Sequence, residues 1–185
     1  MPQNPLPFSI QGQNCTEWCW AAVVSSIAQF VKSAQPPQQC QVVDREAFST
    51  NFPSPGCCNP TNSCKGDPNR LCNRPGSIGR ALAAFNLTAD SSGQTPGPAD
   101  FSTIVQQIDQ SCVVVFELSD VANPALTHVV VAYGHSGTDD LMIADPADAS
   151  CKSQSYSALL NPGQLLTNFP GWQLTSFFTT VPRPS

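Results

Sequence analysis

The first regular pattern in the chain is residues 18–33, where apolar side chains recur at intervals of three and four. They are Trp20, Val23, Val24, Ile27, Ala28, Phe30 and Val31. This spacing predicts a helix with one buried face. Polar residues 13–17 precede it and two adjacent prolines, Pro36 and Pro37, follow it. The pattern therefore predicts a loop before the helix and a break after it.

Three further segments of the first half predict helices. Residues 40–52, 77–87 and 100–110 each carry apolar residues on one side, and Asp100 occupies the N-cap position of the last. Residues 53–75 are rich in Pro, Asn and Cys, so they predict an irregular segment that needs cross-links to stay ordered. This segment is either a solubilising surface loop or one wall of a substrate groove.

The second half carries short apolar runs bounded by Gly, Asn, Asp or Pro, which predict strands. The runs are 112–118, 128–133 and 141–144, with more polar, alternating strands at 153–160 and 172–181. A helical half followed by a stranded half predicts an α+β fold. We expect a mainly helical part at 13–110 and an antiparallel sheet at 111–185, within a single domain of 1–185.

Composition removes several classes of partner. Only 11% of the 185 residues are charged, and the net charge is −5, so no electrostatic footprint for nucleic acid or an anionic membrane exists. No apolar run is long enough to predict a membrane span. The first residues lack the basic and apolar regions of a signal peptide. We therefore expect a removed leader, a longer precursor or export by a dedicated machine.

Candidate chemistry begins at Cys19, in the first turn of the first predicted helix. Unpaired backbone N–H groups and the positive end of the helix dipole favour the thiolate at that position. Gln13, in the preceding loop, can bring its amide beside the Cys19 N–H, and two such donors form an oxyanion hole. The alternative is an inert cysteine in a core helix, which is favoured unless a histidine and an aspartate follow at suitable places.

The chain has two histidines. His128 opens an apolar strand, where one side of its ring can face a cleft, so we predict that it is the base. His135 lies between glycines and is expected in an exposed hairpin loop. Asp145 ends the next predicted strand, so a hairpin returns it to His128, whose ring it can orient; otherwise it is a turn-forming Asp-Pro. The predicted catalytic residues are Cys19, His128, Asp145 and Gln13.

Eight further cysteines remain: Cys15, Cys40, Cys57, Cys58, Cys64, Cys72, Cys112 and Cys151. An even number beside one reactive thiol predicts a disulfide framework and an oxidising compartment. The alternative is a zinc site built from Cys57, Cys58, Cys64 and Cys72, although two adjacent cysteines followed by longer gaps fit zinc spacing poorly. Cys15 is close enough to Cys19 to cross-link the loop before it.

Three stretches resemble the papain-like cysteine peptidase superfamily. Gln13, five residues, then Cys19-Trp20-Ala21 is similar to the active-site opening of these enzymes. The form Trp-Cys-Trp-Ala-Ala is most similar to bacterial branches, the bacteriocin-leader-processing peptidases and the effector proteases of plant pathogens. His-Val-Val-Val-Ala-Tyr-Gly from His128, and Ala-Asp-Pro around Asp145, resemble their histidine and aspartate segments.

The resemblance implies a nucleophile helix packed on a sheet and peptide hydrolysis by a Cys-His-Asp triad, without a cofactor or a metal. It implies a protein or peptide substrate, an inhibitor or immunity protein as a further partner, and a monomer that is secreted or delivered outside the producing cell, as a protease, toxin or effector. Two alternatives stay open: an amidase, isopeptidase or acyltransferase with the same triad, and a disulfide-rich binding module without catalysis.

Overall fold

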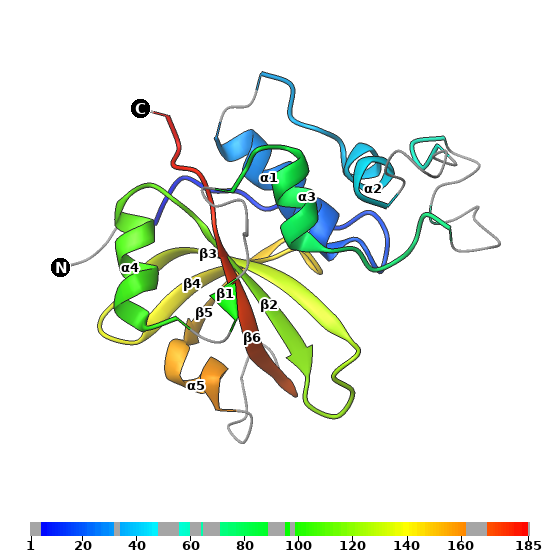
Figure 1. Cartoon of the computed structure of the whole chain (residues 1–185). Coiled ribbons are helices and arrows are strands. Elements are labelled where there is room, and N and C mark those ends of the chain that lie inside the picture. Colours follow the sequence, from blue (N-terminus) through cyan, green and yellow to red (C-terminus); the bar gives the residue numbers. More distant parts are fainter. Residues whose placement is uncertain are drawn as a thin grey trace.

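The structure is a computed structural model, and it describes residues 5–31, 34–47, 56–59, 64, 71–88, 95–96, 99–161 and 170–184. Its helices are α1 (Cys19–Phe30), α2 (Gln39–Ala47), α3 (Ile78–Ala84), α4 (Phe101–Asp109) and α5 (Tyr156–Leu160). Its strands are β1 (Thr95–Pro96), β2 (Val114–Asp120), β3 (Thr127–Ser136), β4 (Asp140–Asp145), β5 (Ser150–Ser155) and β6 (Trp172–Thr179). Helices α1 to α3 gather on one side of the sheet (Figure 1).

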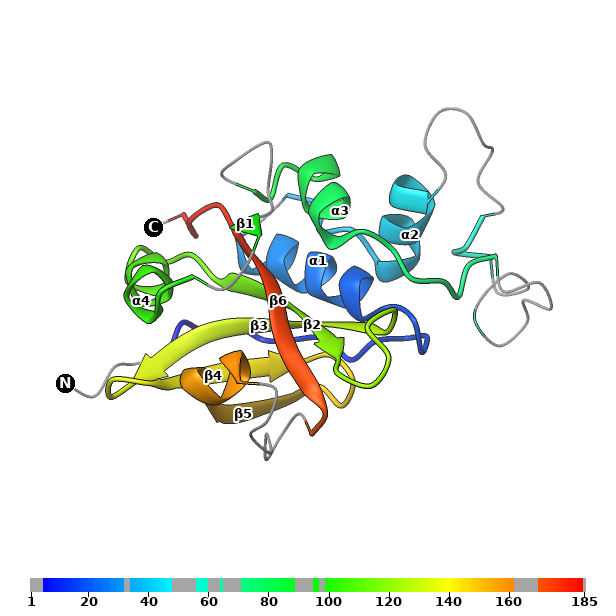
Figure 2. The ribbon, with the colours of Figure 1, turned by 60° about the horizontal axis from the view of Figure 1, so that its bottom comes forward.

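Helix α1 lies between the sheet and helices α2 and α3 (Figure 2). Every residue from Cys19 to Phe30 is buried except Gln29. The sequence predicted one buried face, but more of the helix is buried than expected, because neighbouring elements cover it on all sides. Small residues such as Ala21, Ala22 and Ser25 allow neighbouring elements to approach it closely.

The strands of the sheet lie in the order β1-β6-β2-β3-β4-β5, with antiparallel pairing between the described neighbours. Val115 and Val131 face the core that contains α1, whereas Phe116 and Val130 face the core that contains residues of α4 and α5. Because apolar groups cover both faces, β2 and β3 read as continuous apolar runs rather than alternating ones.

The segment predicted as a strand at 153–160 divides into two elements. Strand β5 ends at Ser155, and α5 begins at Tyr156. The Ser155 hydroxyl accepts a hydrogen bond from the Ala158 N–H, so this serine caps the helix and stops the strand. Strand β1, which pairs with β6, was not expected. Residues 48–52 of the second predicted helix, and most of 53–75, lie outside the described residues.

Three disulfides join Cys15 to Cys64, Cys40 to Cys58 and Cys57 to Cys72. All four cysteines of the zinc alternative are therefore used in disulfides, and that alternative is wrong. The expectation that eight cysteines pair is also wrong, because Cys112 and Cys151 are free. Cys112 lies just before β2, and Cys151 lies on β5. Strands β3 and β4 lie between β2 and β5, so these two strands are roughly 14 Å apart, which is too far for a disulfide bond.

No helix of the described residues is long and apolar enough to cross a membrane.

Candidate active site

A pocket of about 310 Å³ opens where the start of α1 meets the sheet. Gln13 and Cys19 line it from the helical side, and His128 lines it from β3. Asp145 lies behind His128, on the neighbouring strand β4. The structure thus brings together all four residues that the sequence analysis selected.

Cys19 is the first residue of α1 and is 8% exposed. The N-cap residue, Trp18, makes no side-chain hydrogen bond to the helix. The first intrahelical bond runs from the Ala22 N–H to the Trp18 carbonyl, so the Cys19 N–H has no partner within the helix. A thiol and a backbone donor without a helical partner therefore lie at one helix end, where the dipole favours negative charge.

His128 lies between Asp145 and Cys19. Its Nε2 is 2.8 Å from Asp145 Oδ1, and the two side chains are 15% and 5% exposed. Cys19 lines the same pocket as His128 and raises the pKa of the ring. Because Asp145 contacts Nε2, Nδ1 is the ring nitrogen left for the thiol. The Ala147 N–H donates to the same Asp145 oxygen at 2.9 Å, so the carboxylate cannot rotate freely.

The charges of this group reinforce one another. Burial lowers the pKa of His128, but hydrogen bonds and negative charge from Asp145 and Cys19 outweigh it and raise the pKa to about 9. Burial also raises the pKa of Asp145, but hydrogen bonds from His128, Lys152 and Ala147 hold that pKa well below its usual range. The site therefore favours an imidazolium beside a carboxylate.

The β3–β4 hairpin explains how these residues meet. Val131 pairs with Ala144, so His128 and Asp145 both lie toward the same end of the two strands. The indole of Trp172, from β6, packs against the His128 ring with centroids 5.7 Å apart. Sequence reasoning did not select Trp172; its only signal was an aromatic residue at the start of a predicted strand.

Lys152 on β5 is a second residue that sequence reasoning missed. Its Nζ lies 2.7 Å from Asp145 Oδ2 and 3.2 Å from Asp148 Oδ2. Asp145 thus contacts His128 through one oxygen and Lys152 through the other. The available signal was a lysine directly before a predicted strand, in a chain with only eight Lys and Arg residues.

Gln13 ties the loop before Cys19 to the turn after Asp145. Its backbone N–H donates to the Pro146 carbonyl at 2.8 Å. Its side-chain Nε2 donates to the carbonyls of Cys15 and Thr16, at 3.0 and 2.8 Å. The amide therefore faces the loop, and within the described residues its Oε1 is buried without a partner.

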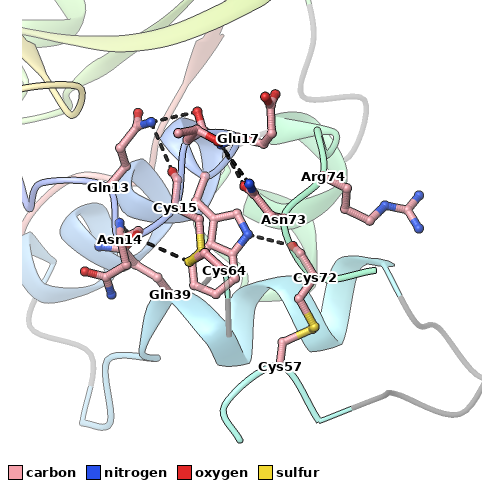
Figure 3. Close-up of a disulfide and its surroundings, with 12 residues drawn as sticks. Gln13, Asn14, Cys15, Glu17, Gln39, Cys57, Cys64, Cys72, Asn73 and Arg74 are labelled. Atoms are coloured by element: carbon pink, nitrogen blue, oxygen red, sulfur yellow. Dashed lines mark hydrogen bonds between the residues drawn. A yellow bond between two sulfur atoms is a disulfide. The ribbon is translucent and has the colours of Figure 1, made fainter. Parts of the chain in front are cut away.

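The cysteine-rich segment holds the same loop from the other side (Figure 3). Besides the Cys15–Cys64 disulfide, the Trp18 indole donates to the Cys72 carbonyl at 2.7 Å, and the Glu17 N–H donates to Asn73 Oδ1 at 3.0 Å. Trp18 is buried, so it packs the helix start rather than facing the pocket.

The chain after this anchor forms a wall of the pocket. Pro75 and Gly76 both line it. A Cβ atom at Gly76 would collide with the Trp20 indole, so only glycine allows the chain to pass so close to α1. This placement favours the substrate-groove interpretation for the end of the cysteine-rich segment.

His135 was expected in an exposed loop, and this expectation is wrong. The residue belongs to β3, is 5% exposed and lies 3.2 Å from the Asp109 carboxylate of α4. Strand β3 continues to Ser136, so the turn comes later than the flanking glycine indicated, and α4 covers the ring. His135 lines a different pocket from Cys19.

No protein-family model matches the sequence, and no curated protein matches it. Among solved structures, the chain is similar to the peptidase domain of Streptococcus ComA, a bifunctional ABC transporter involved in a quorum sensing pathway. The likeness has a TM-score of 0.53 and 16% sequence identity, and it covers 94% of this chain and 98% of that one. The chain therefore shares the α+β fold of that peptidase domain, and the α+β class is the one that its sequence predicted.

Proposed function

We propose that the protein is a cysteine peptidase in which Cys19 is the nucleophile, His128 the acid and base, and Asp145 the residue that orients His128. One observation carries the proposal: the His128 ring contacts Asp145 at 2.8 Å and lines the same pocket as Cys19, which lies at a helix N-terminus. A core histidine needs one partner for each ring nitrogen, but it does not need a thiol at a helix N-terminus.

In the first step, the Cys19 thiolate attacks the carbonyl carbon of the scissile peptide bond. The carbonyl oxygen becomes an oxyanion, for which the Cys19 N–H is the first donor. Gln13 is the second donor, when its amide turns from the loop carbonyls toward the oxyanion. His128 then gives its proton to the leaving amine, and a thioester remains on Cys19.

In the second step, water attacks the thioester carbon while His128 accepts a proton from that water. The thiolate leaves as the acid product departs, and the imidazolium–thiolate pair is restored. Asp145 stays ionised throughout, because its hydrogen bonds hold its pKa well below its usual range. Its role is to fix the ring and stabilise the positive charge.

The residues that line the pocket indicate which substrates fit it best. Leu126, Val129, Trp172 and Pro75 are apolar and surround the reacting residues. Peptides with an apolar side chain beside the cleaved bond should therefore fit best. The three disulfides support action in an oxidising compartment.

The test combines a thiol-reactive epoxide with a peptide-library cleavage screen. We expect the epoxide to modify Cys19 and to block cleavage of peptides with apolar residues at the scissile bond. The experiment uses a Cys151→Ser variant, because Cys151 is an exposed free thiol that would add a second label. Modification of Cys19 without any peptide cleavage would favour an amidase or acyltransferase. If Cys19 were not modified and no peptide were cleaved, a binding module without catalysis would be the remaining interpretation.

A further inference from the structure

The buried Asp145 carboxylate has a cationic partner that the mechanism above does not use. Lys152 Nζ is 2.7 Å from Oδ2, whereas His128 Nε2 is 2.8 Å from Oδ1. The Asp145 side chain is only 5% exposed, so water screens both contacts weakly. One carboxylate is thus shared between an ammonium group and an imidazole.

The strand pairing directs Lys152 to this position. Asp145 on β4 is opposite Ser150 on β5, and Lys152 is two residues further along the same face of β5. A long side chain can reach such a diagonal neighbour. Asp148 contacts the same ammonium group at 3.2 Å, which limits its freedom to leave Asp145.

We propose that Lys152 is a positioning residue that fixes the Asp145 carboxylate and draws part of its negative charge away from His128, so that the imidazolium can release its proton during the reaction. The catalytic part of this statement rests on the proposed peptidase function. Without Lys152, the carboxylate would act on His128 alone and hold the ring proton more tightly. His128 would then be a weaker acid toward the leaving amine.

The charged groups around the pair are consistent with this division. Within the described residues, Cys19 approaches His128 from α1, Lys152 approaches Asp145 from β5, and Glu17 lines the same pocket. Burial lowers the pKa of Lys152, but Asp145 and Asp148 outweigh it and raise the pKa above its usual value. The ammonium group therefore stays charged while His128 titrates.

The test measures the titration of His128 directly by NMR, in a Cys19→Ser background that removes the thiol from the equilibrium. The chain has only two histidines, so His135 serves as the internal reference. We expect Lys152→Met to raise the His128 midpoint by roughly one pH unit. Lys152→Gln should do the same, whereas Lys152→Arg, which keeps the charge, should leave the midpoint nearly unchanged. Thermal unfolding confirms that each variant is folded.

The same substitutions in the Cys19 enzyme test the catalytic consequence. We expect Lys152→Met to lower kcat roughly tenfold with little change in KM, and Lys152→Arg to restore it. An unchanged or lower His128 midpoint in both neutral variants overturns the proposal, whether or not the protein cleaves peptides. A raised midpoint with an unaltered kcat overturns its catalytic half. A raised midpoint in a protein that cleaves no peptide counts against the peptidase function and supports the positioning role.

Discussion

The Gln13 N–H donates to the carbonyl of Pro146, the residue that follows Asp145. This single hydrogen bond of 2.8 Å joins the loop before Cys19 to the turn after Asp145. The two loops come from the helical half and the sheet half of the chain. A shift in either loop should therefore change the positions of both Cys19 and His128.

Replacement of Cys19 or His128 should abolish peptide cleavage. Each of Cys19→Ser and His128→Ala should lower kcat by about 10³-fold or more, and the double variant should be little worse, because the two groups act together. Steady-state kinetics on the best library peptide measures this. A Cys19→Ser variant that kept a tenth of the wild-type rate would exclude Cys19 as the nucleophile.

His135 gives the matched control for His128. Because its ring is buried against α4 and contacts Asp109, His135→Ala should lower the free energy of unfolding by about 1–3 kcal/mol. The ring does not line the pocket of Cys19, so kcat should stay within about twofold of the wild type. Denaturant unfolding and kinetics test the two parts separately. Equal loss of activity in both histidine variants would contradict the choice of His128.

The pKa of His128 predicts a pH dependence that Asp145 controls. Activity needs the protonated ring, so kcat/KM of the wild type should fall as the pH rises through about 9. Asp145→Asn removes the negative charge but keeps an oxygen that can accept from the ring. It should reduce kcat less than His128→Ala and move the alkaline fall to lower pH by roughly one to two units. A fall at the same pH in both proteins would show that Asp145 does not set this pKa.

Stability should follow the same titration. The pKa of His128 is raised in the folded state from 6.5 to about 9, so its stabilising contribution is complete below pH 6.5 and is lost as the pH rises through about 9. This loss should be about 3 kcal/mol, because one pKa unit corresponds to roughly 1.4 kcal/mol. Urea unfolding at several pH values measures it. His128→Ala should flatten the curve over this interval, and an equally steep curve would place the titrating group elsewhere.

The sequence located the catalytic candidates because their signals are local. Cys19 follows a polar loop at the start of a periodic apolar run, and His128 and Asp145 lie at the ends of apolar strands. Two strands joined by a short hairpin lie side by side, so the outer ends of the two strands lie near each other. The contact between His128 and Asp145 could therefore be predicted from these segments alone. The α+β order followed from the change in period between the halves.

The missed residues depend on contacts between distant segments. Lys152 reaches Asp145 because β5 pairs with β4 in one register, and no local pattern fixes that register. His135 was misplaced because the glycine beside it resembled a turn, although α4 covers this part of β3. The amide of Gln13 was placed near the Cys19 N–H, but a side chain with several carbonyl acceptors nearby has no unique orientation in the sequence.

The corrected cysteine pairing leaves three free thiols rather than one, and two of them should react in the folded protein. In the folded protein, an alkylating reagent should label Cys19, which lines the pocket, and Cys151, which is exposed. Cys112 should be labelled only after unfolding, because burial raises the pKa of its thiol and blocks access. Mass spectrometry without reduction counts the labels. A single native label would mean that Cys112 and Cys151 are paired.

The Cys15–Cys64 disulfide should matter more for activity than the others. It closes a loop with a sequence separation of 49, so its loss should cost about 4 kcal/mol by chain entropy. It also fixes Cys15, whose carbonyl accepts from Gln13. In a Cys15→Ser/Cys64→Ser variant, we therefore expect kcat to fall at least about tenfold at temperatures where the protein stays folded.

The Cys40–Cys58 disulfide provides the comparison for this last effect. It closes a shorter loop, with a separation of 18, and neither cysteine belongs to the loop before Cys19. A Cys40→Ser/Cys58→Ser variant should lose about 3 kcal/mol of stability but keep most of its kcat. Thermal unfolding and kinetics on both variants distinguish a role in holding the loop before Cys19 from a general loss of stability. If the two variants lost kcat equally, the cysteine-rich segment would stabilise the fold without positioning Cys19.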